Sequence, residues 1–219
     1  MLHAVRSEQE DLHLLVSRQI VAAILSGAYP EGSILPNEET LSRDLGVSRT
    51  ALRESVKGLV AKGILETRRR RGTLVLARQR WNLFDSDIIA WLRREDGHSV
   101  TGNLLGTLAI VVPGAIELAA SHRNAARLKN TALCAGDASL DSRAAFLLEL
   151  ASAADNAFVA AIISTSITSL LADEPHELDA WTGWLTPRHA AELTGLIGKG
   201  DLSAADFARS DRQKASAIG

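Results

Sequence analysis

Cysteine and aromatic residues are scarce in this sequence. Its 219 residues include one cysteine, Cys134, and only 4% are aromatic. A single cysteine excludes an intramolecular disulfide and a cysteine-rich metal cluster. Hydrophobic residues make up 46% of the chain. Because alanine and leucine dominate among them, the composition favours helices over sheets.

Targeting signals, long apolar runs and enzyme motifs are also missing. The first residues, MLHAVRSEQE, lack the apolar core of a signal peptide. The run LAIVVPGAIELAA is interrupted and too short to span a bilayer. We therefore expect a cytoplasmic protein without a membrane partner. We find no nucleophile elbow, glycine-rich phosphate loop, HxxxH or CxxC motif, so we do not expect an enzyme. Acid–base pairs assembled by the fold leave that alternative open.

Charge is distributed unevenly along the chain. Residues 43–80 contain eleven basic and three acidic residues, a local charge of +8, whereas the whole chain carries −2. The rest of the chain therefore sums to −10. A basic segment joined to an acidic body indicates a polyanionic partner for the basic segment alone.

Two short helices joined by a tight turn are predicted after a longer first helix. Apolar residues at four-residue spacing predict the first helix over residues 8–26. Asn37 and Ser48 are good N-caps for the next two helices, and Gly46 separates them. Beside its apolar stripe, the third helix has a basic face formed by Arg49, Arg53 and Lys57.

Four consecutive arginines, Arg68 to Arg71, lie between two strand-like segments, ILET and TLVLA. We predict a β-hairpin with the arginine run at its tip. Helix, helix, turn, helix and hairpin is the order of a winged helix-turn-helix. We place this predicted domain at residues 1–78.

The sequence changes character after Arg80. We interpret residues 79–96, which include WNLFDSDIIAWLRRE, as a linker helix region, and expect Trp81 and Trp91 to pin it to the following bundle. Residues 97–219 are alanine-rich with helical periodicity. We predict six or seven helices there, with breaks near EDGH, SHRNA, AGDAS, ADEPHE and GKGD. The expected fold class is mainly α, a winged helix-turn-helix followed by an all-α helical bundle.

The predicted third helix has the chemistry of a DNA-recognition helix. In a major groove, Arg49 and Arg53 would pair with guanine, while hydroxyl groups and free backbone N–H groups would bind phosphate oxygens. The wing arginines would follow phosphates or enter the minor groove. Taken alone, such arginines more often form a solvated helix face or a surface turn. Their joint order favours DNA binding, and the predicted contacts are Ser48, Arg49, Thr50, Arg53, Arg69, Arg70, Arg71, Gly72 and Thr73.

Residues 34–75, ILPNEETLSRDLGVSRTALRESVKGLVAKGILETRRRRGTLV, resemble the N-terminal domain of the GntR family of bacterial transcription regulators. The shared features are a Leu-Pro turn, an acidic first turn, LGVSRT, LRE and a wing ending in Gly-Thr-x-Val. Many relatives have a basic residue where Glu39 stands, so a contact made there by some relatives is missing. The operator sequence therefore cannot be inferred. The resemblance implies DNA contacts at Ser48, Arg49, Thr50, Arg53 and Gly72.

The linker and the bundle resemble the FadR subfamily, especially its sugar-acid repressors. In that subfamily the bundle binds a divalent metal through an Asp, a His four residues later and two further histidines, and the metal and a nearby Arg hold a carboxylate effector. Here Arg143 and Leu147 occupy the positions of the Asp and the first His. His189 and Asp211 lie near the other two. A metal needs several converging donors, so we predict that the metal site is lost and expect no cofactor.

Two interpretations of the former metal pocket remain. Leu108, Val112 and Leu147 would line an apolar cavity in which Arg143 pairs directly with an acidic effector. Alternatively, the pocket has closed and these are ordinary core residues. The predicted effector-pocket residues are Leu108, Val112, Arg143, Leu147, His189 and Asp211.

Together these features predict a homodimeric transcription regulator, a repressor on family grounds. It would bind an inverted-repeat operator in double-stranded DNA, would associate with the bacterial nucleoid when bound, and would respond to a small-molecule effector. The alternative is an effector-independent or nonspecific architectural DNA-binding protein.

Overall fold

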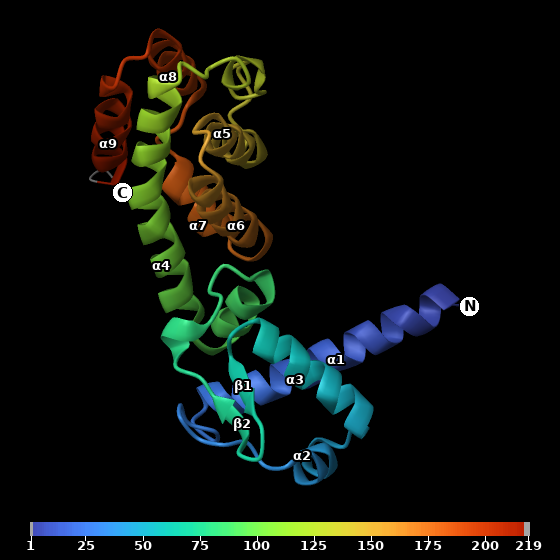
Figure 1. Cartoon of the computed structure of the whole chain (residues 1–219). Coiled ribbons are helices and arrows are strands. Elements are labelled where there is room, and N and C mark those ends of the chain that lie inside the picture. The colour runs from blue at the N-terminus through green and yellow to red at the C-terminus, as the bar shows by residue number, and fades with distance from the viewer. Residues whose placement is uncertain (1, 217–219) are drawn as a thin grey trace. The chain divides into compact units, whose positions relative to one another are not determined.

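The computed structural model of the chain is mainly helical (Figure 1). The structure describes the backbone of residues 2–216 and the side chains of residues 13–210. The chain forms two compact units, residues 1–95 and residues 96–219. The predicted fold class is confirmed, because a winged helix-turn-helix is followed by a helical unit. The expected linker region was residues 79–96, and residues 79–95 are grouped with the first unit. The three-part domain division stays a prediction.

The first unit contains the helices, the turn and the hairpin in the predicted order. The first helix, α1, begins earlier than its apolar spacing predicted. The elements are α1 (Leu2–Leu25), α2 (Glu38–Leu45), α3 (Arg49–Ala61), β1 (Leu65–Arg68), β2 (Gly72–Val75) and the 3-10 helix η1 (Arg78–Arg80).

The hairpin is antiparallel, with Leu65 opposite Val75 and Arg68 opposite Gly72. The chain that leads into α2 pairs with its second strand. The Leu35 amide donates to the Thr73 carbonyl at 2.8 Å. The wing is thereby attached to the segment that positions α2.

The apolar stripe of α1 packs against α3 and forms the core of the first unit. Ile20, Leu52 and Leu59 are fully buried there. The Ser55 hydroxyl donates to the His13 carbonyl at 2.9 Å and joins the two helices. Each buried aliphatic side chain contributes roughly 1.5–3 kcal/mol to folding stability. This packing holds α3 in a fixed orientation against α1.

The long helix α4 (Ser86–Ser121) begins in the first unit and continues in the second. Asp96 leaves the helical region, with φ −149° and ψ 73°, at the place where a break near EDGH was predicted. By length and composition α4 could cross a membrane, so the expectation that no apolar segment is long enough is wrong. Core helices of soluble proteins pass the same test.

The second unit buries a continuous aliphatic core that includes Phe146, Ile163 and Leu193. The predicted breaks after α4, before α5, between α6 and α7 and between α8 and α9 are confirmed. Two further breaks were not predicted, at Asp155 and at Thr186. The elements after α4 are η2 (Leu128–Asn130), α5 (Leu140–Ala153), α6 (Ala157–Asp173), α7 (Pro175–Thr182), α8 (Pro187–Lys199) and α9 (Ser203–Ser216).

Candidate DNA-binding surface

Local capping positions the two helices of the helix-turn-helix. The Asn37 side chain accepts the Thr40 amide at 2.9 Å and begins α2. Gly46 ends α2 in the left-handed conformation, with φ 67°, which glycine adopts without the clash of a Cβ. The Ser42 hydroxyl donates to the Val47 carbonyl at 2.6 Å and closes the turn. Capping and turn chemistry thus place α3 directly after α2, as the sequence predicted.

The first turn of α3 is exposed and polar. The Ser48 hydroxyl accepts the Ala51 amide at 3.1 Å, which confirms Ser48 as the N-cap. Arg49, Thr50 and Arg53 are all exposed. The unpaired N–H groups and positive dipole end of a helix N-terminus favour anions, so this end suits phosphate oxygens.

Both candidate base-reading arginines are held by acids of α2. The Arg49 guanidinium lies 3.2 Å from the Glu39 carboxylate. The Arg53 Nε donates to the Glu38 carboxylate at 2.7 Å. The sequence predicted an acidic first turn for α2 but not its contacts with the arginines of α3. The pairs orient the arginines before any ligand binds.

The hairpin tip presents three exposed arginines. Within the part of the chain that the structure describes, Arg69, Arg70 and Arg71 form no ion pair. Arg68 differs, because its guanidinium donates to Glu66 at 2.9 and 3.0 Å and lowers the pKa of that carboxyl. The free cations of the wing are therefore residues 69–71.

Backbone conformation at the tip depends on glycine. Arg70 has a φ of 64° and Gly72 a φ of 92°. A Cβ on Gly72 would lie 2.8 Å from Ile34 Cγ2, so a side chain there would require Ile34 to shift and would be strained at this positive φ. Thr73, which follows, is half-buried.

The two groups of candidate contacts lie at one end of the unit. In Figure 1 the hairpin turn, α2 and the end of α3 that follows α2 all lie at the lower end of the first unit. The bond between Leu35 and Thr73 joins the wing to the start of α2. In this view the predicted helix and wing contacts therefore belong to elements at the same end of the first unit.

A half-buried cation, Lys62, holds the start of α4 to this domain. Lys62 Nζ lies 2.6 Å from Asp85 and 2.8 Å from Asp87. Burial lowers the pKa of Lys62, but its hydrogen bonds to the two carboxylates outweigh that effect and raise it. The ammonium also lies 5.8 Å from the centroid of the Trp91 ring, and the Trp81 indole donates to a carbonyl of the same unit. Both tryptophans, expected to pin the linker to the bundle, thus pack within the first unit.

A protein-family model matches the part of the chain that forms these helices and the wing. The family described as bacterial regulatory proteins, gntR family, matches residues 13–75. The N-terminal domain belongs to the gntR family. The matched span runs from α1 to the end of the wing and so contains every predicted DNA contact.

Curated relatives of the GntR domain are transcription regulators. The uncharacterized HTH-type transcriptional regulator YieP of Escherichia coli is 39% identical over 52% of this chain and 50% of its own length. The galactonate operon transcriptional repressor of Escherichia coli is 38% identical over 33% of this chain and 32% of its own. The chain thus spans about half, or less, of the curated relatives it matches. The solved structure of Lar, which controls expression of the Listeria monocytogenes agr system, is 19% identical over 94% of each chain, with a TM-score of 0.48.

Beyond the GntR domain, the residues predicted to form an effector pocket lie mostly in the core. Leu108, Val112 and Leu147 are buried in the main aliphatic cluster of the second unit. Arg143 is also mostly buried, with a side chain 12% exposed, and it pairs with Asp179. Its charge is therefore already neutralised within the chain.

Of the two remaining predicted pocket residues, the structure describes the side chain of His189 but not that of Asp211. His189 Nδ1 is hydrogen-bonded with the Trp184 carbonyl, and its ring meets Phe207 edge-on at 5.7 Å. Asp211 lies in the part of α9 whose side chains the structure does not describe. Beside Val112 and Trp184 there is a hollow of only about 10 Å³, roughly the space for one water molecule.

The residues that the FadR-subfamily resemblance places at metal positions do not have the chemistry of ligands for a divalent cation. Arg143 and Leu147 supply a positive charge and an aliphatic group, neither of which ligates a metal. Among the residues that the structure describes, no group of three or more His, Cys, Asp or Glu side chains could hold a metal ion.

Proposed function

We propose that this GntR-domain protein is a transcription repressor that binds an inverted-repeat operator as a homodimer. The observation that carries the proposal is that exposed arginines occupy both the first turns of α3 and the wing tip, on elements that lie at the same end of the first unit. An α3 N-terminus of this kind enters the major groove, where Arg49 and Arg53 read guanine edges. Ser48 and Thr50 bind phosphates.

The wing completes the contact with DNA. Arg69, Arg70 and Arg71 follow the phosphates or enter the neighbouring minor groove, and the hairpin backbone at Gly72 and Thr73 comes close to the duplex. The ion pairs that Arg49 and Arg53 form with Glu39 and Glu38 do not prevent these two arginines from binding DNA. Exposed pairs contribute only about 0–1 kcal/mol, so phosphates and bases can replace the carboxylates.

Selection of duplexes from a random pool tests sequence specificity and dimer symmetry together. We expect an enriched inverted repeat. Arg49→Ala should weaken binding to the selected operator by about 1–3 kcal/mol and relax one position of each half-site. Arg70→Ala should weaken binding to operator and random DNA alike, because it removes a phosphate contact.

The opposite pattern identifies the alternative function. If no motif is enriched, or if Arg49→Ala weakens operator and random DNA equally, the protein is a nonspecific architectural factor. Competition by random-sequence duplex measures the ratio of operator affinity to random-DNA affinity directly. Sequence-specific DNA-binding proteins bind their sites about 10³-fold or more tightly than random DNA.

We further propose that a small carboxylate effector, bound in the second unit, controls DNA binding. The support is Arg143, whose buried Nε has no hydrogen-bond partner although the side chain pairs with Asp179. A carboxylate would replace Asp179, and the hollow beside Val112 and Trp184 would have to widen. One curated relative is named as the galactonate operon repressor, so galactonate is the first probe to use.

Thermal unfolding tests the effector assignment. Saturating galactonate should raise the unfolding midpoint of the wild-type protein and of Arg188→Met, but not that of Arg143→Met. At a hundredfold excess over Kd the expected gain in unfolding free energy is about 2.7 kcal/mol. No shift in the wild type, or an equal shift in all three proteins, overturns the assignment.

Neither a metal, a catalytic step nor a membrane has a part in this proposal. The positions of the family metal hold Arg143 and Leu147, and the named relatives are regulators rather than enzymes. We place the protein in the cytoplasm, and on the nucleoid when bound, because its proposed ligand is chromosomal DNA.

A further inference from the structure

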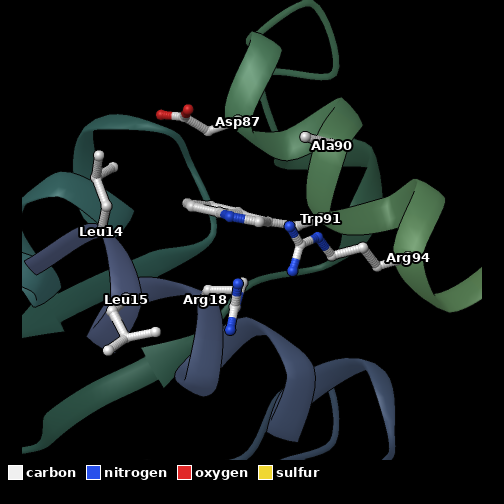
Figure 2. Close-up of a pocket in the computed structure, with 7 residues that line it drawn as sticks. All are labelled: Leu14, Leu15, Arg18, Asp87, Ala90, Trp91 and Arg94. Carbon is white, nitrogen blue, oxygen red and sulfur yellow. The ribbon is translucent and has the colours of Figure 1, made fainter. Parts of the chain in front are cut away.

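A pocket of about 290 Å³ lies in the first unit between α1 and the first turns of α4 (Figure 2). None of its residues belongs to the candidate DNA contacts. It is lined by Leu14, Leu15 and Arg18 of α1 and by Asp87, Ala90, Trp91 and Arg94 of α4.

Two arginines from different helices meet in this pocket. Figure 2 shows the guanidinium groups of Arg18 and Arg94 directed into the same space beside the Trp91 ring. Among the described residues neither forms an ion pair or a side-chain hydrogen bond. Two like charges that converge without an acid repel each other, and an anion between them would remove that repulsion.

The acid in the pocket does not neutralise these arginines. The Asp87 carboxylate lies 2.8 Å from Lys62 Nζ, which raises the pKa of that lysine and commits the acid to it. In Figure 2 it points away from both guanidinium groups. The arginine end of the pocket therefore keeps its positive charge.

The opposite wall is apolar. Leu14 and Leu15 are exposed although both line the pocket, whereas Trp91, beside the arginines, is buried. Covering exposed aliphatic surface contributes about 25 cal/mol per Å². A ligand with a hydrophobic body gains this contribution, and a bare inorganic anion does not.

We infer that this pocket binds a small organic anion. Arg18 and Arg94 hold its carboxylate, and its apolar body lies over Trp91 and against Leu14 and Leu15. A volume of about 290 Å³ is at the lower end of small-molecule sites, so the ligand is small. The forked guanidinium groups suit a planar carboxylate, which accepts two parallel N–H donors from each arginine.

Binding here would also regulate DNA affinity, a consequence that rests on the proposed function. The ligand touches α1, which packs on α3, and the α4 turns just before the non-helical Asp96. Clamping these elements together favours one direction of α4 where it leaves the GntR domain. DNA affinity changes only if the ligand binds that arrangement more tightly than others.

Isothermal titration with 4-phenylbutyrate, without DNA, tests the site itself. The wild type should bind this probe at least about tenfold more tightly than neutral 4-phenylbutanol, because only the carboxylate forms charge-assisted hydrogen bonds with the two guanidinium groups. Arg18→Gln and Arg94→Gln should each weaken binding by a similar factor. Arg188→Gln, an exposed arginine on α8, should not.

Each contrary result of these titrations overturns one part of the proposal. Equal affinity for acid and alcohol overturns the anion-holding role, and an equal loss in Arg188→Gln overturns the location. If the Gln variants change dimer dissociation and not probe affinity, the arginines hold an acidic segment of another copy instead of a small ligand.

Fluorescence anisotropy with the selected operator tests the regulatory part separately. The probe should shift the operator affinity of the wild type severalfold and leave that of the two Gln variants unchanged. A probe that binds without altering DNA affinity overturns the regulatory part but not the site. Failure of the wild type to bind any duplex contradicts the proposed function and leaves the titration result standing.

Discussion

Glu39 lies where a DNA-binding surface is expected to be positive. Its carboxylate is 74% exposed and lies 3.2 Å from Arg49, whose side chain is 63% exposed. In the free protein this pair orients Arg49. Near a duplex the carboxylate competes with guanine for the arginine and repels the phosphates. We therefore expect Glu39 to limit DNA affinity while it positions Arg49, the proposed base-reading residue.

Replacing Glu39 with glutamine should consequently strengthen DNA binding. We expect Glu39→Gln to raise affinity for operator and random duplex about threefold to tenfold, since an exposed ion pair and one like-charge repulsion each contribute up to about 1 kcal/mol. Anisotropy titrations over a range of salt concentrations measure the change. Glu31→Gln, an exposed acid in the loop before α2, is the matched control. An equal gain in the control would mean that only net charge matters.

Residues close in sequence were predicted better than pairs brought together by the fold. Asn37, Ser48 and Gly46 were identified from capping and turn chemistry, which acts within a few residues. The partners of Arg53 and Arg143 lie 15 and 36 residues away. Those contacts depend on helix packing angles, which local sequence patterns do not encode.

At the scale of elements, the hairpin was predictable because its strands and arginine tip are contiguous. The helix breaks were harder. Asp96 leaves the helical region, yet helix continues on both sides of it, so the predicted break is a kink. The break at Thr186 was missed although Thr186 caps α8 and Pro187 follows it, a recognisable helix start. Alanine-rich periodicity on both sides concealed that signal.

No local sequence pattern predicted the contact between the end of α3 and the start of α4. Lys62 ends α3, and its acidic partners lie 23 and 25 residues later at the start of α4. Asp85 also accepts the Asp87 and Ile88 amides and so caps α4. One residue therefore both begins the helix and holds it to α3. This combination makes the start of α4 part of the DNA-binding unit.

For the molecule as a whole, the outer face of α4 in the second unit is the best surface for a second copy. Only 44% of its most apolar segment is buried within the chain. Ile110 is 79% exposed, and Gly102, Gly106 and Gly114 follow the same four-residue spacing with open space where a side chain would lie. Two such helices can approach closely, since glycine leaves room for a facing backbone. Water contact with this face is unfavourable, and a partner copy removes it.

A charge at Ile110 should therefore separate the proposed dimer. We expect Ile110→Glu to raise the dimer dissociation constant at least about tenfold in sedimentation equilibrium, because a buried unpaired carboxylate in an interface is strongly unfavourable. Phe158→Glu is the matched control, since Phe158 is 84% exposed but lies on α6. Operator affinity should fall with Ile110→Glu, while affinity for a single half-site should stay the same, because each GntR domain is intact and only the coupling of two half-sites is lost. A dimer unaffected by Ile110→Glu but lost in Phe158→Glu would move the interface to α6.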